Sequence, residues 1–343
     1  MLCPNVEHNL SWRVDGSLSP CNNIINFPAF YILEEMQSSN EYKQLISDNC
    51  NGVKSIYCTR CWDKEYLGLK SKRQQDQHLD TVLRKINSHY LKIDSALGST
   101  CNAACVICGP GSSSLWQKYI PIDKQTQKSQ IWNITYQNLE QIVQLDFGGG
   151  EPWLNELDKQ EELFDKLIQT GLSKKIKIRY NTNGSLYPKK LLAKLRHFRQ
   201  VEITLSIDDI EDRFEYNRWP LKWHTVLSNI EKLKQLSKDS FNILLTINFT
   251  VSVFTWLRAE QFIKWAEQFG INKVNFNILT SPKIYSIKSL PLDKINCKTQ
   301  FDDIIGTDSI IDWSDKFQEH VDLLDQKRKT EWRKIFPELR TLI

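Results

Sequence analysis

The feature that most limits the fold of this chain is a repeated alternation of strand-like and helix-like segments between residues 89 and 290. The strand candidates, rich in β-branched and aromatic residues, are 90–96, 142–149, 175–182, 201–208, 243–253 and 273–279. Between them lie segments with a 3.6-residue apolar period, such as EELFDKLIQTGL at 161–172 and WHTVLSNIEKLKQL at 223–236. Six such units predict an α/β fold with a parallel sheet, either open and doubly wound or curled into a barrel.

Three further segments flank this α/β region. Residues 1–62 are rich in cysteine and turns, and Asp15-Gly16 within SWRVDGSLSPC predicts a β-hairpin. Residues 63–88 predict a charged helical connector, and residues 291–343 predict a mostly helical C-terminal extension. A length of 343 residues predicts roughly two domains.

Composition and charge exclude several classes of partner. The chain is 41% hydrophobic, enough for a core, and its net charge of +4 gives no reason to expect nucleic acid as a partner. RNA modification would require a broad basic and aromatic face. No apolar run approaches the roughly 18 residues of a membrane span, and MLCPNVEHNL does not read as a signal peptide. We therefore expect a cytoplasmic protein, without a membrane partner, whose thiols are reduced.

The cysteines are unevenly distributed. Eight of the nine lie in the first third of the chain, and the full set is Cys3, Cys21, Cys50, Cys58, Cys61, Cys101, Cys105, Cys108 and Cys297. Cysteines that merely fill a core would be scattered. Their clustering favours metal binding or catalysis over a disulfide framework.

Three of them, Cys101, Cys105 and Cys108, follow the first strand of the α/β region. Functional loops gather at the carboxyl ends of parallel strands. Zinc bound by three thiolates needs a fourth ligand, and no histidine lies nearby in the sequence. A [4Fe–4S] cluster held by three thiolates instead leaves one iron open to another ligand. Both metals remain possible on these residues alone.

The spacing Cys101-x3-Cys105-x2-Cys108 resembles the cluster-binding motif of the radical S-adenosylmethionine (SAM) enzymes. Ile107 stands where that family usually has an aromatic residue. The stretch LDFGGGEPW at 145–153 ends the second strand candidate and is similar to the family's Gly-Gly-Glu-Pro motif. The resemblance implies a partial (β/α)6 barrel, a [4Fe–4S] cluster on the three cysteines, and SAM as a second cofactor.

The same resemblance implies a set of SAM contacts. A carboxylate can accept charge-assisted hydrogen bonds from the SAM ammonium, and glycines let the backbone approach a ligand. The implied SAM-binding residues are Gly149, Gly150, Glu151, Asn183, Ser206, Asp208 and Arg218. Asn, Ser and Asp at strand ends also cap the following helix, which is the alternative role for those residues.

The N-terminal cysteines carry a second resemblance. Cys3-x12-Gly16-x4-Cys21 is similar to the opening of the auxiliary-cluster domains called SPASM and twitch, and Cys58-x2-Cys61 resembles a closing pair. Residues 1–62 thus resemble a permuted twitch domain that precedes the barrel, with a second [4Fe–4S] cluster on Cys3, Cys21, Cys58 and Cys61. A zinc ribbon is the alternative, and Cys50 is a competing ligand.

Together these resemblances imply a reaction. A radical SAM enzyme takes an electron from an external donor such as flavodoxin or ferredoxin, reductively cleaves SAM to a 5′-deoxyadenosyl radical, and abstracts a substrate hydrogen. The implied substrate is a ribosomal peptide or other natural-product precursor that is cross-linked, epimerised or oxidised. The alternatives are a sugar or nucleoside epimerase or dehydrogenase, and a non-catalytic iron–sulfur electron carrier or binding protein. Cys297 is a candidate hydrogen-atom donor, with a small buried hydrophobe as its alternative role.

Overall fold

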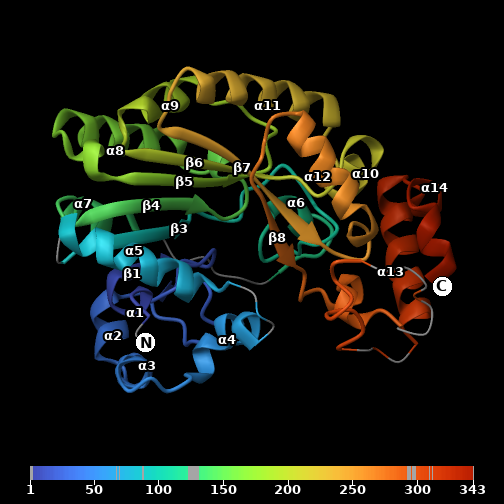
Figure 1. The fold of residues 1–343 in the computed structure, drawn as a ribbon, viewed down its shortest axis with the longest axis horizontal. Coiled ribbons are helices and arrows are strands. Elements are labelled where there is room, and N and C mark those ends of the chain that lie inside the picture. The colour runs from blue at the N-terminus through green and yellow to red at the C-terminus, as the bar shows by residue number, and fades with distance from the viewer. Residues whose placement is uncertain are drawn as a thin grey trace. The chain divides into compact units, whose positions relative to one another are not determined.

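The computed structural model of the chain has eight strands in one mostly parallel sheet (Figure 1). It describes all residues except 1–2, 67, 69, 87–88, 123–130, 292–294, 296–298, 309, 311 and 343. The strand order is β2-β1-β3-β4-β5-β6-β7-β8. The strands are β1 (Asn9–Trp12), β2 (Leu18–Ser19), β3 (Leu91–Ala96), β4 (Ile142–Gly148), β5 (Lys177–Thr182), β6 (Gln200–Ser206), β7 (Ile243–Val251) and β8 (Val274–Ile278).

The six predicted strands correspond to β3–β8, which confirms the α/β prediction. Neighbouring strands β3 and β4, β4 and β5, and β7 and β8 run parallel. The order and direction of these strands are consistent with a partial barrel of the radical SAM type. Among the described residues, no helix is both long and apolar enough to cross a membrane.

The helices fall mainly where the 3.6-residue period predicts them. They are α1 (Asn5–His8), α2 (Leu33–Ser38), α3 (Asn40–Cys50), α4 (Thr59–Tyr66), α5 (Lys72–Ile86), α6 (Ser114–Gln117), α7 (Ile131–Gln137), α8 (Leu157–Gln169), α9 (Lys189–Lys194), α10 (Glu211–Asn217), α11 (Trp223–Lys238), α12 (Ala259–Gln268), α13 (Trp313–Arg328) and α14 (Trp332–Ile335). The predicted connector contains α5, and the predicted C-terminal extension contains α13 and α14.

The chain divides into two compact units. Unit 1 comprises Met1–Thr100, Ile122–Asn181 and Pro188–Glu202, and unit 2 comprises Cys101–Pro121, Thr182–Tyr187 and Ile203–Ile343. The domain boundaries expected at residues 62, 88 and 290 stay predictions.

In unit 1 the sheet separates an apolar face from a charged one. Phe147 of β4 stacks on Tyr180 of β5, with ring centroids 4.9 Å apart, and also contacts Phe164 of α8. Successive residues of a strand point to opposite faces, so the neighbours of Phe147 and Tyr180 belong to the other face. There Arg179 of β5 forms an ion pair with Asp146 of β4 at 3.2 Å. One face is therefore core and the other carries charge.

The predicted N-terminal hairpin belongs to this sheet, which the sequence did not indicate. Gly16 has φ +82° in the turn, and β1 and β2 pair antiparallel as expected from Asp15-Gly16. In addition, β1 pairs parallel with β3. Leu10 and Trp12 of β1 are buried, and this apolar surface gives the hairpin a physical reason to join the sheet.

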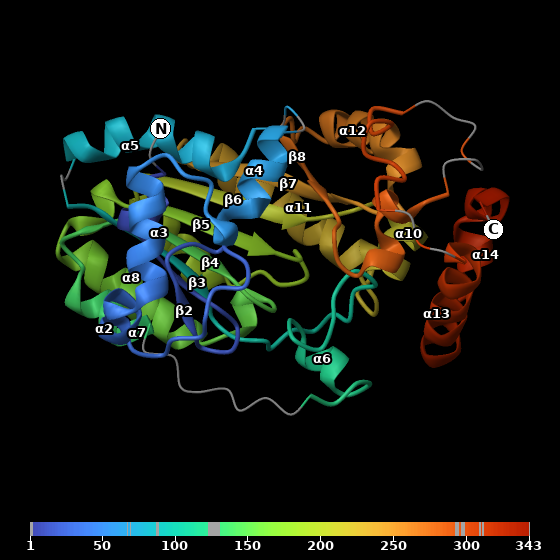
Figure 2. The ribbon, with the colours of Figure 1, turned by 90° about the horizontal axis from the view of Figure 1, so that it is seen from below.

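In unit 2 the C-terminal helices pack through an aromatic cluster. Phe254 lies 5.6 Å from Phe317 of α13 and 5.1 Å from Phe336, measured between ring centroids. Phe336 also contacts Tyr216 of α10 edge-on at 5.2 Å. Figure 2 shows α13 and α14 side by side. Aromatic burial of this kind anchors α13 within unit 2.

Candidate functional site

The three-cysteine loop, residues 101–108, is held in unit 2 by main-chain hydrogen bonds to the last residue of α10 and to the segment that follows it. The amide of Ala104 donates to the Trp219 carbonyl at 2.7 Å, and the amide of Val106 donates to the Asn217 carbonyl at 2.9 Å. These two bonds fix the middle of the loop. Its shape is therefore set by contacts far away in sequence as well as by its own turns.

The Cys105 and Cys108 thiols share a hydrogen bond, and the charge of Arg218 acts on both. A hydrogen bond with the Cys108 thiol and the charges of Arg218 and Arg328 lower the pKa of the Cys105 thiol to about 7. The same hydrogen bond raises the pKa of Cys108. The Cys101 sulfur accepts a hydrogen bond from the Ala103 amide at 3.4 Å. A thiol with a pKa near 7 is partly thiolate at neutral pH, which is the form that binds metal.

Two of the predicted SAM contacts, Asp208 and Arg218, form a buried ion pair in unit 2. Arg218 donates through Nε at 2.8 Å and approaches Oδ2 of Asp208 through Nη2 at 2.6 Å. Asp208 also accepts a hydrogen bond from the Thr250 amide at 2.8 Å. The pair orients the guanidinium and largely neutralises it, because both groups are withdrawn from water.

Asn183, another predicted SAM contact, connects the end of β5 with the three-cysteine loop. Its Nδ2 donates to Oδ1 of Asn102 at 3.0 Å, and its Oδ1 accepts from the Ser185 amide at 2.9 Å. Asn102 in turn donates to the Ser185 hydroxyl at 2.9 Å. The predicted contact Ser206 ends β6 and is half-buried.

The predicted SAM turn at Gly149, Gly150 and Glu151 lies in unit 1 and depends on its glycines. Gly149 has φ +78° and Gly150 has φ +49°. A Cβ atom on Gly150 would lie 2.3 Å from the Thr100 carbonyl oxygen. The Glu151 amide donates to that same oxygen at 2.9 Å. The turn is therefore closed tightly on the residue that directly precedes Cys101 in the chain, and only glycine fits there.

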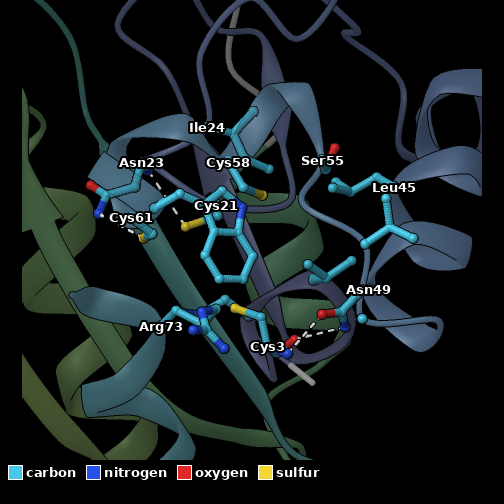
Figure 3. Close-up of a pocket in the computed structure, with 15 residues that line it drawn as sticks. Cys3, Cys21, Asn23, Ile24, Leu45, Asn49, Ser55, Cys58, Cys61 and Arg73 are labelled. Atoms are coloured by element: carbon cyan, nitrogen blue, oxygen red, sulfur yellow. Dashed lines mark hydrogen bonds between the residues drawn. The ribbon is translucent and has the colours of Figure 1, made fainter. Parts of the chain in front are cut away.

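Four thiols from unit 1 line a single cavity with a volume of about 60 Å³, shown in Figure 3. We call Cys3, Cys21, Cys58 and Cys61 the N-terminal thiol set. The cavity has room for more than one water-sized group. Cys50, at the end of α3, is exposed and does not line it. The structure therefore brings together all four cysteines of the predicted auxiliary site and leaves their competitor outside.

The N-terminal thiol set is buried and receives hydrogen bonds. Burial raises the pKa of Cys3 and that of Cys58 to about 12. The Asn23 amide donates to the Cys21 sulfur at 3.4 Å, and the Asn23 side chain donates to the Cys61 sulfur at 3.9 Å. Hydrogen bonds to sulfur are a usual feature of iron–sulfur sites.

Two residues that hydrogen-bond the three-cysteine loop, Asn217 and Arg328, also have buried donors without a partner among the described residues. Neither side-chain atom of Asn217 has a hydrogen-bond partner in the described part of the chain, although the residue is 3% exposed. Nη1 of Arg328 is also buried and has no hydrogen-bond partner among the described residues. Unsatisfied buried donors are costly, and an iron–sulfur cluster on the thiolates would offer them sulfur acceptors. Within the described residues, no three His, Cys, Asp or Glu side chains form a site for a single metal ion.

Sequence reasoning missed Asn217 and Arg328. Asn217 directly precedes Arg218, so its position in EYNRW was a usable signal. Arg328 hydrogen-bonds a residue 224 positions away, and no local pattern marks it. Cys297, the candidate hydrogen-atom donor, lies outside the described residues.

Residues 96–254 match the model of the radical SAM superfamily, and this range includes β4 to β7, the three-cysteine loop and the glycine turn. This confirms the resemblance seen in the sequence. The twitch-like character of the N-terminal segment stays a prediction.

Individual relatives are distant. The uncharacterized protein MJ0907 of Methanocaldococcus jannaschii is 24% identical over 191 residues, which cover 56% of this chain and 63% of that protein. This chain therefore spans less than two thirds of the length of that relative.

Two solved structures are similar to this chain over part of its length. Native anSMEcpe with bound AdoMet is 19% identical, with 60% of this chain and 54% of that chain covered and a TM-score of 0.43. SuiB of Streptococcus suis bound to S-adenosylmethionine is 12% identical, with 86% and 60% covered and a TM-score of 0.42.

Proposed function

We propose that this protein reductively cleaves SAM and abstracts a hydrogen atom from a substrate. The observation that carries the proposal is the set of hydrogen bonds around the three-cysteine loop. The Glu151 amide binds the Thr100 carbonyl just before the loop, and Asn183 binds Asn102 within it. When bound, the cluster and SAM supply a carbon radical that can attack an unactivated C–H bond.

In this proposal the cofactors are held by residues with separate tasks. Cys101, Cys105 and Cys108 ligate three irons of the cluster, and the lowered pKa of Cys105 favours its thiolate. Gly149, Gly150, Glu151, Asn183, Ser206, Asp208 and Arg218 bind SAM. Asp208 keeps the Arg218 guanidinium in one orientation, ready to meet the SAM carboxylate.

We also propose a second [4Fe–4S] cluster on the N-terminal thiol set. The shared cavity and the hydrogen bonds from Asn23 to two sulfurs support it. A cluster there can pass or accept an electron, because cluster potentials depend on ligation and exposure. An external carrier such as flavodoxin or ferredoxin supplies the reducing electron.

The proposed substrate is a ribosomal peptide or another natural-product precursor, which is cross-linked, epimerised or oxidised. This substrate class rests on the similarity of the N-terminal cysteine spacing to auxiliary-cluster domains. Cys297 is proposed as a hydrogen-atom donor for an epimerisation.

A sugar or nucleoside substrate is the second candidate, and the charged sheet face of unit 1 favours it. Arg179 lies between Asp146 at 3.2 Å and Glu202 at 3.5 Å, and Asp94 is paired with Lys72. Such a face provides both donors and acceptors for hydroxyl groups. A non-catalytic electron carrier fits less well, because it has no use for the constrained turn at Gly149 and Gly150.

Anaerobic reconstitution with iron, sulfide, SAM and a strong reductant tests the proposal. We expect 5′-deoxyadenosine, and about four irons should remain when Cys101, Cys105 and Cys108 are all replaced by Ala. The Cys50→Ala variant is the matched control and should retain both clusters. A fully loaded protein that forms no 5′-deoxyadenosine would exclude the proposed reaction.

A further inference from the structure

Arg328, the last residue of α13, reaches into the three-cysteine loop of unit 2. Its Nη2 donates a hydrogen bond to the Ala104 carbonyl, which lies between the first and second cysteines. Arg328 is 8% exposed. Its Nη1 is buried and has no hydrogen-bond partner in the described part of the chain. A C-terminal helix thus places an incompletely satisfied cation beside the loop.

Two tryptophans fix the position of this guanidinium. Its central carbon lies 5.2 Å from the ring centroid of Trp116 and 5.5 Å from that of Trp219. Trp116 donates through Nε1 to the Cys105 carbonyl at 2.8 Å, and the Trp219 carbonyl accepts from the Ala104 amide at 2.7 Å. The Trp116 ring, the Trp219 carbonyl and the guanidinium therefore all hydrogen-bond the main chain at Ala104 and Cys105, and cation–π contacts with the two rings hold the charge in place.

The charge of Arg328 is not neutralised as that of Arg218 is. Arg218 is paired with Asp208, whereas no carboxylate forms an ion pair with Arg328 in the ranges that the structure describes. Burial lowers the pKa of Arg328, and attraction to Tyr216 and Cys105 opposes that effect. A buried cation without a counter-charge is costly, so a function that needs its charge is the simplest account of it.

We propose that Arg328 is a positioning residue that offsets the negative charge of the cluster on Cys101, Cys105 and Cys108 and makes this cluster easier to reduce. The inference rests on the proposed function, since it needs that cluster. Reduction adds an electron to a group already made negative by thiolates. A fixed buried cation stabilises the reduced form more than the oxidised form, so it raises the midpoint potential.

The test is a redox titration followed by electron paramagnetic resonance on the reconstituted full chain, using the signal that changes when SAM is added. Arg328→Gln should shift the midpoint potential of this cluster to more negative values and slow its reduction. Arg328→Lys keeps the charge and should stay near the wild-type potential. Lys327→Gln removes an exposed charge from the neighbouring position of α13 and is the matched control, with no shift expected.

The outcomes separate this inference from the proposed function. An unloaded wild-type protein, with no SAM-dependent signal, contradicts the proposed function itself. A loaded Arg328→Gln variant with the wild-type potential overturns the inference alone, as does an equal shift in Arg328→Lys. If Arg328→Gln does not load iron, the midpoint potential of Arg328→Lys tests the inference instead. This variant loses the planar guanidinium contacts but keeps the positive charge. A wild-type potential then supports the inference, and a shifted one refutes it.

Discussion

The three-cysteine loop pairs a thiol of lowered pKa, Cys105, with one of raised pKa, Cys108, whereas the shifted thiols of the N-terminal thiol set all have raised pKa values. In the loop, the hydrogen bond with Cys108 and the nearby arginines lower the pKa of Cys105 to about 7. In the N-terminal set, burial raises the pKa of Cys3 and that of Cys58 to about 12. The loop thus has one thiol ready to bind metal at neutral pH. The N-terminal set must be deprotonated by the metal that it binds.

The largest expected effect comes from removing the N-terminal site alone. Cys58→Ser with Cys61→Ser should lower the iron content by about four per chain and abolish product formation, while 5′-deoxyadenosine is still formed. Iron analysis and chromatography of the reaction measure both. Loss of SAM cleavage together with the N-terminal iron would show that the two sites do not act separately.

A second large effect is expected at Gly150. Gly150→Ala places a Cβ atom 2.3 Å from the Thr100 carbonyl oxygen in a backbone with φ +49°, so we expect a loss of about 3 kcal/mol in the free energy of unfolding and weak SAM binding. Urea unfolding and SAM titration measure these effects.

The matched control for that change is Gly171→Ala. Gly171 has φ +74° and no atom within 4 Å of the added Cβ, so this variant tests backbone strain alone. It should cost about 1–2 kcal/mol and leave SAM affinity unchanged. Equal effects of the two substitutions would contradict a tightly closed turn at Gly150.

The third expected effect is a difference between the two cysteine sites in the pH dependence of iron uptake. Metal binding releases the thiol protons, so raised thiol pKa values make iron uptake more favourable as pH rises. Between pH 7 and pH 9 the N-terminal set should gain iron more steeply than the loop, because Cys3, Cys21 and Cys58 all have raised pKa values, whereas in the loop the pKa of Cys108 is raised but Cys105 has already lost most of its proton at pH 8. Iron uptake by variants that lack one site or the other gives the two profiles. Parallel profiles would refute the electrostatic difference.

The smallest expected effect concerns Asn23. Asn23→Ala removes the side-chain donor 3.9 Å from the Cys61 sulfur and keeps the main-chain donor to Cys21. A weak donor lost from a thiolate should shift the N-terminal cluster slightly to more negative potential and leave the SAM-site cluster unchanged. A redox titration that resolves both clusters checks it. An unchanged N-terminal potential would show that this contact does not tune the cluster.

Strand and helix positions were predictable because their signals are local. The periods that mark β3–β8 and α8, α11, α12 and α13 lie within each segment, and the loop cysteines are close together in sequence. The pairing of β1 with β3 was not predictable, because Asn9 and Lys92 meet across more than one intervening helix. The role of Arg328 was not predictable either, because its hydrogen-bond partner Ala104 lies 224 positions away in the sequence. Asp208 and Arg218 were both selected by resemblance, but their ion pair appears only in the structure.

The short strand β2 has a consequence for solubility. It ends the sheet with only Leu18 and Ser19, and the Leu18 amide donates to the Phe30 carbonyl at 2.6 Å. A long free strand edge is a template on which another chain can add a strand, whereas a two-residue edge whose amide is already used offers little. The N-terminal hairpin thus shields β1, and through it the parallel sheet, from edge-to-edge aggregation.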